Sequence, residues 1–223
     1  MRAVAVVPAF NEAGTIVHVI EGLRGAVDHV LVVDDGSTDG TAEAARRAGA
    51  EVMAHETNRG KGQAIRSALV ALRGRDFTHA LMLDGDMQHL PAEAPRFLDA
   101  AARTGADVVL GERQFDRAAM PASRYQANRI GSRALSWFVG TRFRDTQCGY
   151  RLFRLAALDG IALGGRGYEI ETEMLVKLAR RGARMTTVPV TAVYAGQRSK
   201  LRPVRDTTKT CFLAVYYRFI ERL

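Results

Sequence analysis

Short apolar runs that look like β-strands alternate with helical patterns along the first half of the chain. The strand-like runs cover residues 3–7, 30–33, 51–55, 78–83 and 107–110, and the helical patterns cover 15–23, 41–48, 62–72 and 92–102. Near-continuous Val and Leu runs separated by helices are typical of strands buried on both faces of a parallel sheet. Right-handed crossovers place the helices on the two faces of such a sheet. The sequence therefore predicts an α/β fold with a mostly parallel central sheet flanked by helices.

The length of 223 residues and the hydrophobic content of 47% are enough for one sizeable core, so we expect a single domain over residues 1–223. Cys148 and Cys211 form no disulfide framework and no zinc-binding spacing, which favours a reducing compartment. The apolar run at residues 1–8 is too short for a signal peptide. No stretch approaches the roughly 20 apolar residues that a bilayer crossing needs. We expect a cytoplasmic protein that is soluble or peripheral to a membrane.

The formal net charge of +8 is concentrated in one region of the chain. Residues 113–154 hold nine arginines and two aspartates, which is +7 of the total. Nucleic acid, an anionic bilayer surface and a phosphorylated substrate would all be attracted to such a region. The region carries no RNP-like or Gly-x-x-Gly signature, so the nucleic-acid alternative has little support.

Polar loops follow three of the predicted strands. They are residues 8–12 after the first strand, 34–40 after the second and 84–88 after the fourth. In parallel sheets ligands bind at the carboxyl ends of the strands, so these three carboxylate-bearing loops should face one crevice. The first strand-to-helix turn lacks Gly-x-Gly-x-x-Gly, and the chain has no P-loop motif. Dinucleotide oxidoreductases and P-loop enzymes are therefore disfavoured.

The loop after the fourth strand carries Asp84, Asp86 and Gln88 at alternate positions. Residues two apart on an extended segment share a face, so the three side chains can converge. Hard cations such as Mg²⁺ and Mn²⁺ take oxygen ligands and often complete their shell with substrate phosphates. The motif indicates a metal–diphosphate site, and a polar turn before the helix after Pro91 is the alternative. Gly60-Lys61-Gly62 could likewise steady an anion or only begin a helix.

Several motifs together resemble one family. Pro8-Ala9-Phe10-Asn11-Glu12, Asp34-Asp35-Gly36-Ser37-Thr38-Asp39-Gly40, Asn58-Arg59-Gly60-Lys61-Gly62 and Asp84-Gly85-Asp86-Met87-Gln88-His89 have the order and spacing of family 2 glycosyltransferases. The residues 145–153, 168–171 and 198–201 resemble the polyprenyl-phosphate branch, which includes dolichol-phosphate mannose and glucose synthases. The resemblance covers nearly the whole chain and implies a GT-A fold.

The resemblance also implies a nucleotide-sugar site. By similarity, Pro8, Ala9, Phe10 and Glu12 line the nucleoside pocket and Asp35 holds the base or ribose, with Lys61, Asp84, Gly85 and Asp86 completing the site. A carboxylate can accept hydrogen bonds from ribose hydroxyls or base N–H groups, and Phe10 offers an apolar wall. Asp34 and Asp39 are better explained by turn and capping chemistry.

The same resemblance makes Asp84, Asp86 and Gln88 the ligands of a Mg²⁺ or Mn²⁺ ion that neutralises the departing nucleoside diphosphate. It likens Arg113, Arg124 and Lys200 to basic residues that grip the donor and acceptor phosphates, a task for which arginine is suited. Together with Asp86, these three are the predicted catalytic residues.

The kind of acceptor decides whether a catalytic base is needed. A lipid monophosphate, with a second pKa of about 6, is mostly dianionic at neutral pH and can attack without a protein base. An alcohol acceptor would need one, and Glu169, Glu171 and Glu173 are the candidates. These residues also begin a helix that ends near Arg181, where acidic side chains favour the helix dipole, and we prefer this structural interpretation.

Two segments have the composition of a membrane-interface helix. Residues 128–138 place apolar side chains among arginines, and residues 206–223 form an amphipathic pattern after Asp206. Packing of either helix on the protein's own core is the alternative. We divide the domain into a nucleotide-sugar half (1–112), an acceptor half (113–205) and a C-terminal helix (206–223).

The sequence leads to a metal-dependent, inverting glycosyltransferase. It would move a hexose from UDP-glucose or GDP-mannose to a polyprenyl phosphate at the cytoplasmic membrane surface, with a membrane-protein partner possible. Two alternatives stay open at this point. One is a family 2 enzyme that acts on a soluble alcohol or glycan, and the other is a non-enzymatic module that binds nucleotide-sugar or nucleic acid.

Overall fold

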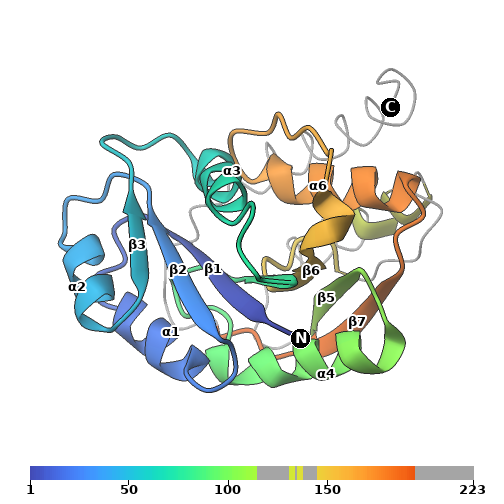
Figure 1. Cartoon of the computed structure of the whole chain (residues 1–223), viewed down its shortest axis with the longest axis horizontal. Coiled ribbons are helices and arrows are strands. Elements are labelled where there is room, and N and C mark those ends of the chain that lie inside the picture. The colour runs from blue at the N-terminus through green and yellow to red at the C-terminus, as the bar shows by residue number, and fades with distance from the viewer. Residues whose placement is uncertain (115–130, 134, 138–144, 194–223) are drawn as a thin grey trace.

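The computed structural model describes residues 1–114, 131–133, 135–137 and 145–193 (Figure 1). Its centre is a seven-stranded sheet of order β3-β2-β1-β4-β6-β5-β7. The strands are β1 (Ala3–Ala9), β2 (His29–Asp34), β3 (Glu51–Ala54), β4 (His79–Met82), β5 (Val108–Arg113), β6 (Arg151–Arg154) and β7 (Met185–Val190). The helices are α1 (Ile16–Leu23), α2 (Thr41–Arg47), α3 (Lys61–Ala71), α4 (Ala94–Thr104) and α6 (Glu169–Arg180), with short 3₁₀ turns η1 (Pro91–Glu93) and η2 (Leu155–Leu158).

The first four strands form the predicted parallel sheet. Val6 of β1 lies opposite Leu31 of β2 on one side and Met82 of β4 on the other, and β3 extends the sheet beyond β2. The connections run through α1, α2 and α3, so strand and helix alternate as the apolar pattern predicts. The carboxyl ends of β1, β2 and β4 consequently meet at one edge of the sheet.

The second half of the sheet differs from the prediction, which ended the series of strands at residues 107–110. β5 does not lie beside β4, because β6 is inserted between them and is antiparallel to both. β7 then pairs in parallel with β5 at the sheet edge. Neither strand has a clear apolar run: β6 is Arg-Leu-Phe-Arg, and β7 carries Pro189, which an edge strand tolerates.

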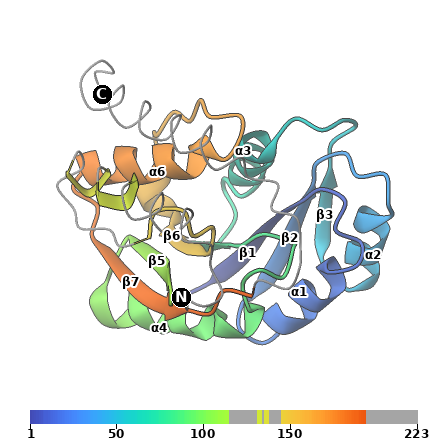
Figure 2. The same ribbon diagram turned by 180° about the vertical axis from the view of Figure 1, so that it is seen from behind.

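Two layers of helices cover the sheet (Figures 1 and 2). The helices α1, α2 and α4 pack on one face around buried side chains such as Ile16 and Phe97. The helices α3 and α6 pack on the other face around Ile65 and Met174. Successive residues of β1 alternate between the two cores, as the two-residue period of a strand requires. The predicted α/β class with helices on both faces is confirmed.

Of the two segments predicted to lie at a membrane, the described residues include part of the first and none of the second. Residues 131–133 and 135–137 are helical, with Leu135 buried in the core on the α3 side and Trp137 77% exposed. One side of this segment therefore packs on the protein, while Trp137 faces outward. The predicted helix at 206–223 lies outside the described residues. Among the helices that are described, none has the length and apolar character needed to cross a membrane.

Candidate active site

The loop after β4 packs directly on the loop after β1. The Thr15 hydroxyl donates a 2.7 Å hydrogen bond to the carbonyl of Gly85. A methyl group placed on Gly85 would lie 3.4 Å from Ala9 Cβ and 3.6 Å from Glu12 Cγ, which is ordinary van der Waals contact, so the two loops lie next to each other at this point. The loop after β2 joins them, because Asn11 N–H donates to the Ser37 hydroxyl at 2.8 Å and Thr38 N–H donates to the Asn11 amide oxygen at 3.0 Å. The structure thus brings together all three loops that the sequence places at this edge.

Asp86 lies close to two other carboxylates, Asp84 and Glu12, where the loops after β1 and β4 meet. The backbone N–H of Gln88 donates to its carboxylate at 3.0 Å, and the intervening Met87 adopts a left-handed conformation with φ of 59°. Burial, together with the negative charge of Asp84 and Glu12, raises the pKa of Asp86 to about 6. Non-glycine residues in the left-handed region concentrate at functional sites. The excess negative charge at this point favours binding of a cation.

Asp84 is held by a lysine that also reaches the second half of the fold. Lys61 Nζ lies 2.5 Å from Asp84 Oδ1 and 2.6 Å from Glu171 Oε1, and 5.3 Å from the centre of the Tyr168 ring. Although burial opposes it, the carboxylates of Asp84 and Glu171 hold the pKa of Lys61 above its ordinary value. The lysine is therefore a permanently charged link between the loop after β4 and α6. One oxygen of Asp84 is already occupied by this link.

The donor set of the site fits a hard cation that is also held by a diphosphate. Within the described residues, no group of three or more His, Cys, Asp or Glu side chains is arranged as a metal site. The loop offers the carboxylate of Asp86, the second carboxylate oxygen of Asp84 and the amide oxygen of Gln88, which are all oxygen ligands. Mg²⁺ typically binds through one or two carboxylates plus phosphate oxygens and water. The residues therefore suit a metal ion that arrives with its substrate.

The chain after β7 supports the loop after β4 from the other side. Val193 N–H donates to the carbonyl of Gln88 at 2.9 Å, and Ala192 forms an antiparallel bridge with His89. His89 is buried, which lowers its pKa, and its Nδ1 is the one buried side-chain N or O atom in the described residues without a hydrogen-bond partner. Burial raises the pKa of the neighbouring Cys148 to about 12, so this thiol is a packing residue and not a nucleophile.

The Gly60-Lys61-Gly62 segment is shaped by close backbone packing against residues 164–167. Gly62 N–H donates to the carbonyl of Arg166 at 2.9 Å. A methyl group on Gly62 would lie 2.4 Å from the Gly165 carbonyl oxygen, and one on Gly60 would lie 2.4 Å from that of Arg166. The two glycines thus let α3 begin against this loop and bring Lys61 to Asp84.

Replacing Gly62 with alanine is expected to lower the free energy of unfolding by about 1–3 kcal/mol, because the added methyl must displace backbone atoms. The matched control is Gly14→Ala, where a methyl would meet no atom within 4 Å and the change should be within about 0.5 kcal/mol. Urea denaturation followed by circular dichroism measures both. Equal urea midpoints for the two variants would contradict this prediction and would show that the backbone at residues 165–166 moves aside at little cost.

Asp35 has internal partners for both carboxylate oxygens. One oxygen accepts from His55 Nδ1 at 2.7 Å and from Arg59 N–H at 2.9 Å, and the other accepts from Gly60 N–H at 2.8 Å. The side chain is almost fully buried. In the structure Asp35 therefore holds the loop before α3, and the contact with the base or ribose that the resemblance implies stays a prediction. His55, which the sequence analysis did not single out, anchors this carboxylate.

The three glutamates that begin α6 all have structural partners. Glu173 is buried and accepts from Gly164 N–H at 2.9 Å and Gly165 N–H at 2.7 Å. Glu169 accepts from the backbone of residues 166 and 167, and Glu171 forms the link to Lys61. The arrangement agrees with the structural interpretation of this trio and leaves none of the three as an uncommitted base.

The predicted phosphate-binding arginine at the end of β5 is fixed by a buried carboxylate. Arg113 donates from Nε to Asp145 at 2.6 Å and from Nη2 at 2.9 Å, which is a bidentate contact. Although burial opposes it, the Arg113 guanidinium holds the pKa of Asp145 below its ordinary value. The other two predicted phosphate ligands, Arg124 and Lys200, lie outside the described residues.

A fully buried arginine on β6 connects the segment at 146–148 to α6. The sequence analysis did not single it out. Arg151 donates to the carbonyls of Cys148, Thr146 and Glu171 at 2.7, 2.7 and 2.8 Å. Its guanidinium also lies 3.7 Å from the Glu171 carboxylate. Glu171 lies 20 positions from Arg151 along the chain, so no local pattern in the sequence predicts this contact.

Comparison with known proteins identifies the family. Residues 4–161 match the family described as Glycosyl transferase family 2. The chain belongs to this family. Glycosyltransferase AglJ of Haloferax volcanii is 40% identical over 219 residues, a match that spans 95% of this chain and 70% of that protein. The undecaprenyl-phosphate mannosyltransferase of Micrococcus luteus is 34% identical over 206 residues, 86% of this chain and 84% of that protein.

A solved structure confirms the fold of this family 2 enzyme. Glucosyl-3-phosphoglycerate synthase of Mycobacterium tuberculosis, in complex with Mn²⁺, UDP-glucose and phosphoglyceric acid, superposes with a TM-score of 0.75. The two are 22% identical, and the match covers 97% of this chain and 79% of that one. The GT-A fold implied by the motifs is thus confirmed, as is the family assignment itself.

Proposed function

We propose that this enzyme is a metal-dependent, inverting hexosyltransferase that uses a nucleoside diphosphate sugar and a polyprenyl phosphate. The observation that carries the proposal is the contact between the loops after β1 and β4, which concentrates Asp86, Asp84 and Glu12 at the carboxyl edge of the sheet. The match to an undecaprenyl-phosphate mannosyltransferase supports the acceptor class. Residues 1–112 would bind the donor and residues 113–205 the acceptor.

The donor would bind between the first loop and the loop after β4. Pro8 and Ala9 form the buried end of β1, and the half-buried Phe10 follows at the edge, where it can wall a nucleoside pocket with Glu12. Gln88 and Asp86 would hold the metal ion. When bound, a Mg²⁺ or Mn²⁺ ion supplies positive charge that stabilises the departing diphosphate.

The acceptor would need little more than orientation. A phosphate monoester is already mostly ionised at neutral pH, so its oxygen can attack the anomeric carbon without a protein base. Arg113, whose orientation is fixed by Asp145, would bind one of the phosphates. The exposed Trp137 beside a basic region suits contact with a membrane interface, and we place the enzyme at the cytoplasmic face.

The other readings of the sequence have weaker support. Transfer to a soluble alcohol or glycan calls for a base, and the three candidate glutamates on α6 are all committed to structural contacts. A purely binding module is at odds with membership in a glycosyltransferase family. A membrane-protein partner would be a further way to reach a lipid acceptor.

Incubation with Mn²⁺ or Mg²⁺, polyprenyl phosphate and a panel of UDP- and GDP-hexoses is expected to yield a glycolipid that mass spectrometry identifies. Omitting the ion, or adding excess EDTA, should reduce the product by at least about a hundredfold because the diphosphate charge is then not neutralised. Unphosphorylated polyprenol is the matched control and should accept no sugar. Transfer to polyprenol or to a soluble alcohol would contradict the proposed acceptor, and full activity in EDTA would contradict the proposed metal.

A further inference from the structure

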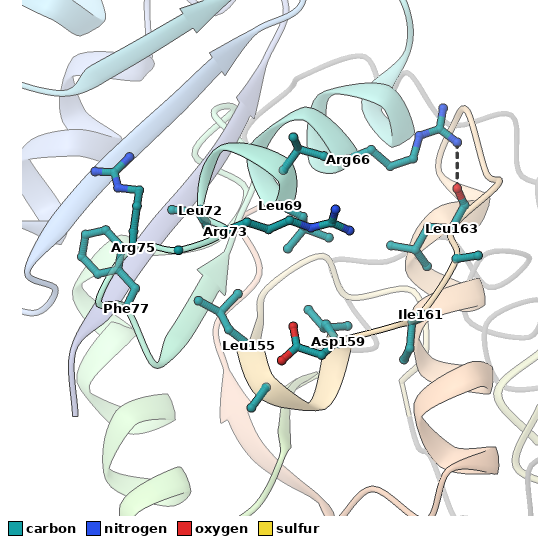
Figure 3. Close-up of a pocket in the computed structure, with 15 residues that line it drawn as sticks. Arg66, Leu69, Leu72, Arg73, Arg75, Phe77, Leu155, Asp159, Ile161 and Leu163 are labelled. Atoms are coloured by element: carbon teal, nitrogen blue, oxygen red, sulfur yellow. Dashed lines mark hydrogen bonds between the residues drawn. The ribbon is translucent and has the colours of Figure 1, made fainter.

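A cavity of about 510 Å³ lies near the amino-terminal end of β4 (Figure 3). It opens between the second half of α3, the turn at residues 74–77 and the segment at 155–163 that follows β6. The volume is within the range of sites that hold a small ligand. None of its lining residues belongs to the sugar-transfer site described above.

The inner wall of the cavity is aliphatic. Leu72 is buried, and the other members of the wall are half-buried on the side of the core that contains α3 and α6. The wall consists of Leu69, Leu72, Leu155, Leu158, Ile161 and Leu163. Val70 stands at the rim with 60% of its surface exposed. Apolar surface that faces water is unfavourable, so an aliphatic group that covered this wall would bind favourably.

The rim of the cavity is positively charged. It carries Arg66, Arg73 and Arg75 against a single acid, Asp159, which is a net charge of +2. Arg75 is paired with Glu51, with its nitrogens 3.1 and 2.9 Å from the carboxylate. Arg66 donates to the neutral Leu163 carbonyl and Gln63 amide, and Arg73 extends toward the middle of the cavity in Figure 3. In the described part of the chain, neither of these two has a carboxylate within ion-pair distance.

The aromatic ring beside the cavity is already covered. The guanidiniums of Arg2 and Arg75 lie 5.4 and 5.1 Å from the centre of the Phe77 ring, and His29 stacks on it at 5.7 Å. A nucleobase would therefore find no open ring for stacking among the lining residues. The combination of two unneutralised arginines with an aliphatic wall selects instead for an anion that carries an aliphatic chain.

We propose that this cavity binds a single-chain aliphatic anion. Its phosphate or carboxylate headgroup would contact Arg66 and Arg73, and its chain would lie along the leucine wall. Arginine forms charge-assisted hydrogen bonds with either headgroup, and each methylene of the chain that the wall buries adds to the affinity. The site is separate from the sugar-transfer centre, so the proposal does not depend on the function proposed above.

Isothermal titration of the full chain with decyl phosphate, below its micelle-forming concentration, tests the proposal. Arg73→Gln is expected to weaken binding about tenfold, because one charge-assisted contact is lost. The matched control is Arg103→Gln on α4, which removes one exposed arginine outside the cavity and should bind as tightly as the wild type. Since the readout is binding rather than sugar transfer, the result is independent of catalytic activity.

Two further probes separate the headgroup from the chain. Inorganic phosphate should bind at least a hundredfold more weakly than decyl phosphate, because it cannot cover the aliphatic wall. Decyltrimethylammonium, which has the chain but the opposite charge, should show no saturable binding that Arg73→Gln alters. Equal affinity of the Arg73→Gln and Arg103→Gln proteins for decyl phosphate would overturn the proposal, as would equally tight binding of the cationic probe.

Discussion

Replacing Asp86 with asparagine is expected to lower the rate of sugar transfer on the order of a thousandfold. The change removes the carboxylate charge that we assign to the metal ion, and the stabilisation of charge at a leaving group is usually the largest catalytic contribution. The shape of the side chain is preserved, so the hydrogen bond from Gln88 N–H can still form. Initial rates with saturating donor and polyprenyl phosphate measure the effect.

The same substitution should leave stability unchanged or slightly higher. Burial and the charges of Asp84 and Glu12 raise the pKa of Asp86 to about 6, so ionising this carboxyl costs more free energy in the folded protein than in the unfolded chain. Removing that charge relieves the repulsion. Asp76→Asn, in an exposed surface pair with Arg2, is the control and should retain full activity. An Asp86→Asn enzyme with wild-type activity would refute the metal assignment, and a loss of stability would mean that Asp86 serves the fold.

Replacing Lys61 with methionine is expected to destabilise the protein by about 3 kcal/mol. The substitution keeps the volume of the side chain but leaves the carboxylates of Asp84 and Glu171 facing each other without the cation between them. Removing one partner of a largely buried ion pair is strongly unfavourable because the remaining charge is uncompensated. Guanidinium denaturation at neutral pH measures the difference in the free energy of unfolding.

Two companion variants show whether this loss comes from the ionic link. Adding Glu171→Gln to Lys61→Met removes one of the uncompensated charges and should recover part of the lost stability. Arg46→Met breaks the exposed pair with Glu43 at 3.4 Å and should cost no more than about 0.5 kcal/mol. If Lys61→Met were no more damaging than Arg46→Met, the link between the loop after β4 and α6 would contribute little to the fold.

The accuracy of the sequence analysis followed the kind of information that each element carries. The parallel strands β1 to β4 and the helices between them have a local periodic pattern, and all were predicted within a few residues. β6 and β7 were missed because a four-residue strand with an arginine at each end and a strand that contains proline lack that pattern. The helix α6 was predicted because its acidic first turn and apolar stripe are local features.

The candidate site was likewise predicted only in part. The loop containing Asp84 and Asp86 could be placed at the sheet edge, since the carboxyl ends of parallel strands coincide. The partners of these residues could not be foreseen. Lys61 was expected either to steady an anion or only to begin a helix, and in the structure it begins α3 and joins two carboxylates of the protein itself.

The sequence by itself determined the order of strands and helices in the first half, the edge at which the polar loops gather and the family to which the chain belongs. Each of these follows from periodicity, chirality or a run of adjacent residues. Only the tertiary structure decided that β6 separates β4 from β5, that Asp35 holds the loop before α3 and that residues 61, 84 and 171 form one ionic link. Contacts between distant positions depend on how the layers pack in three dimensions, and such packing does not produce a periodic pattern in the sequence.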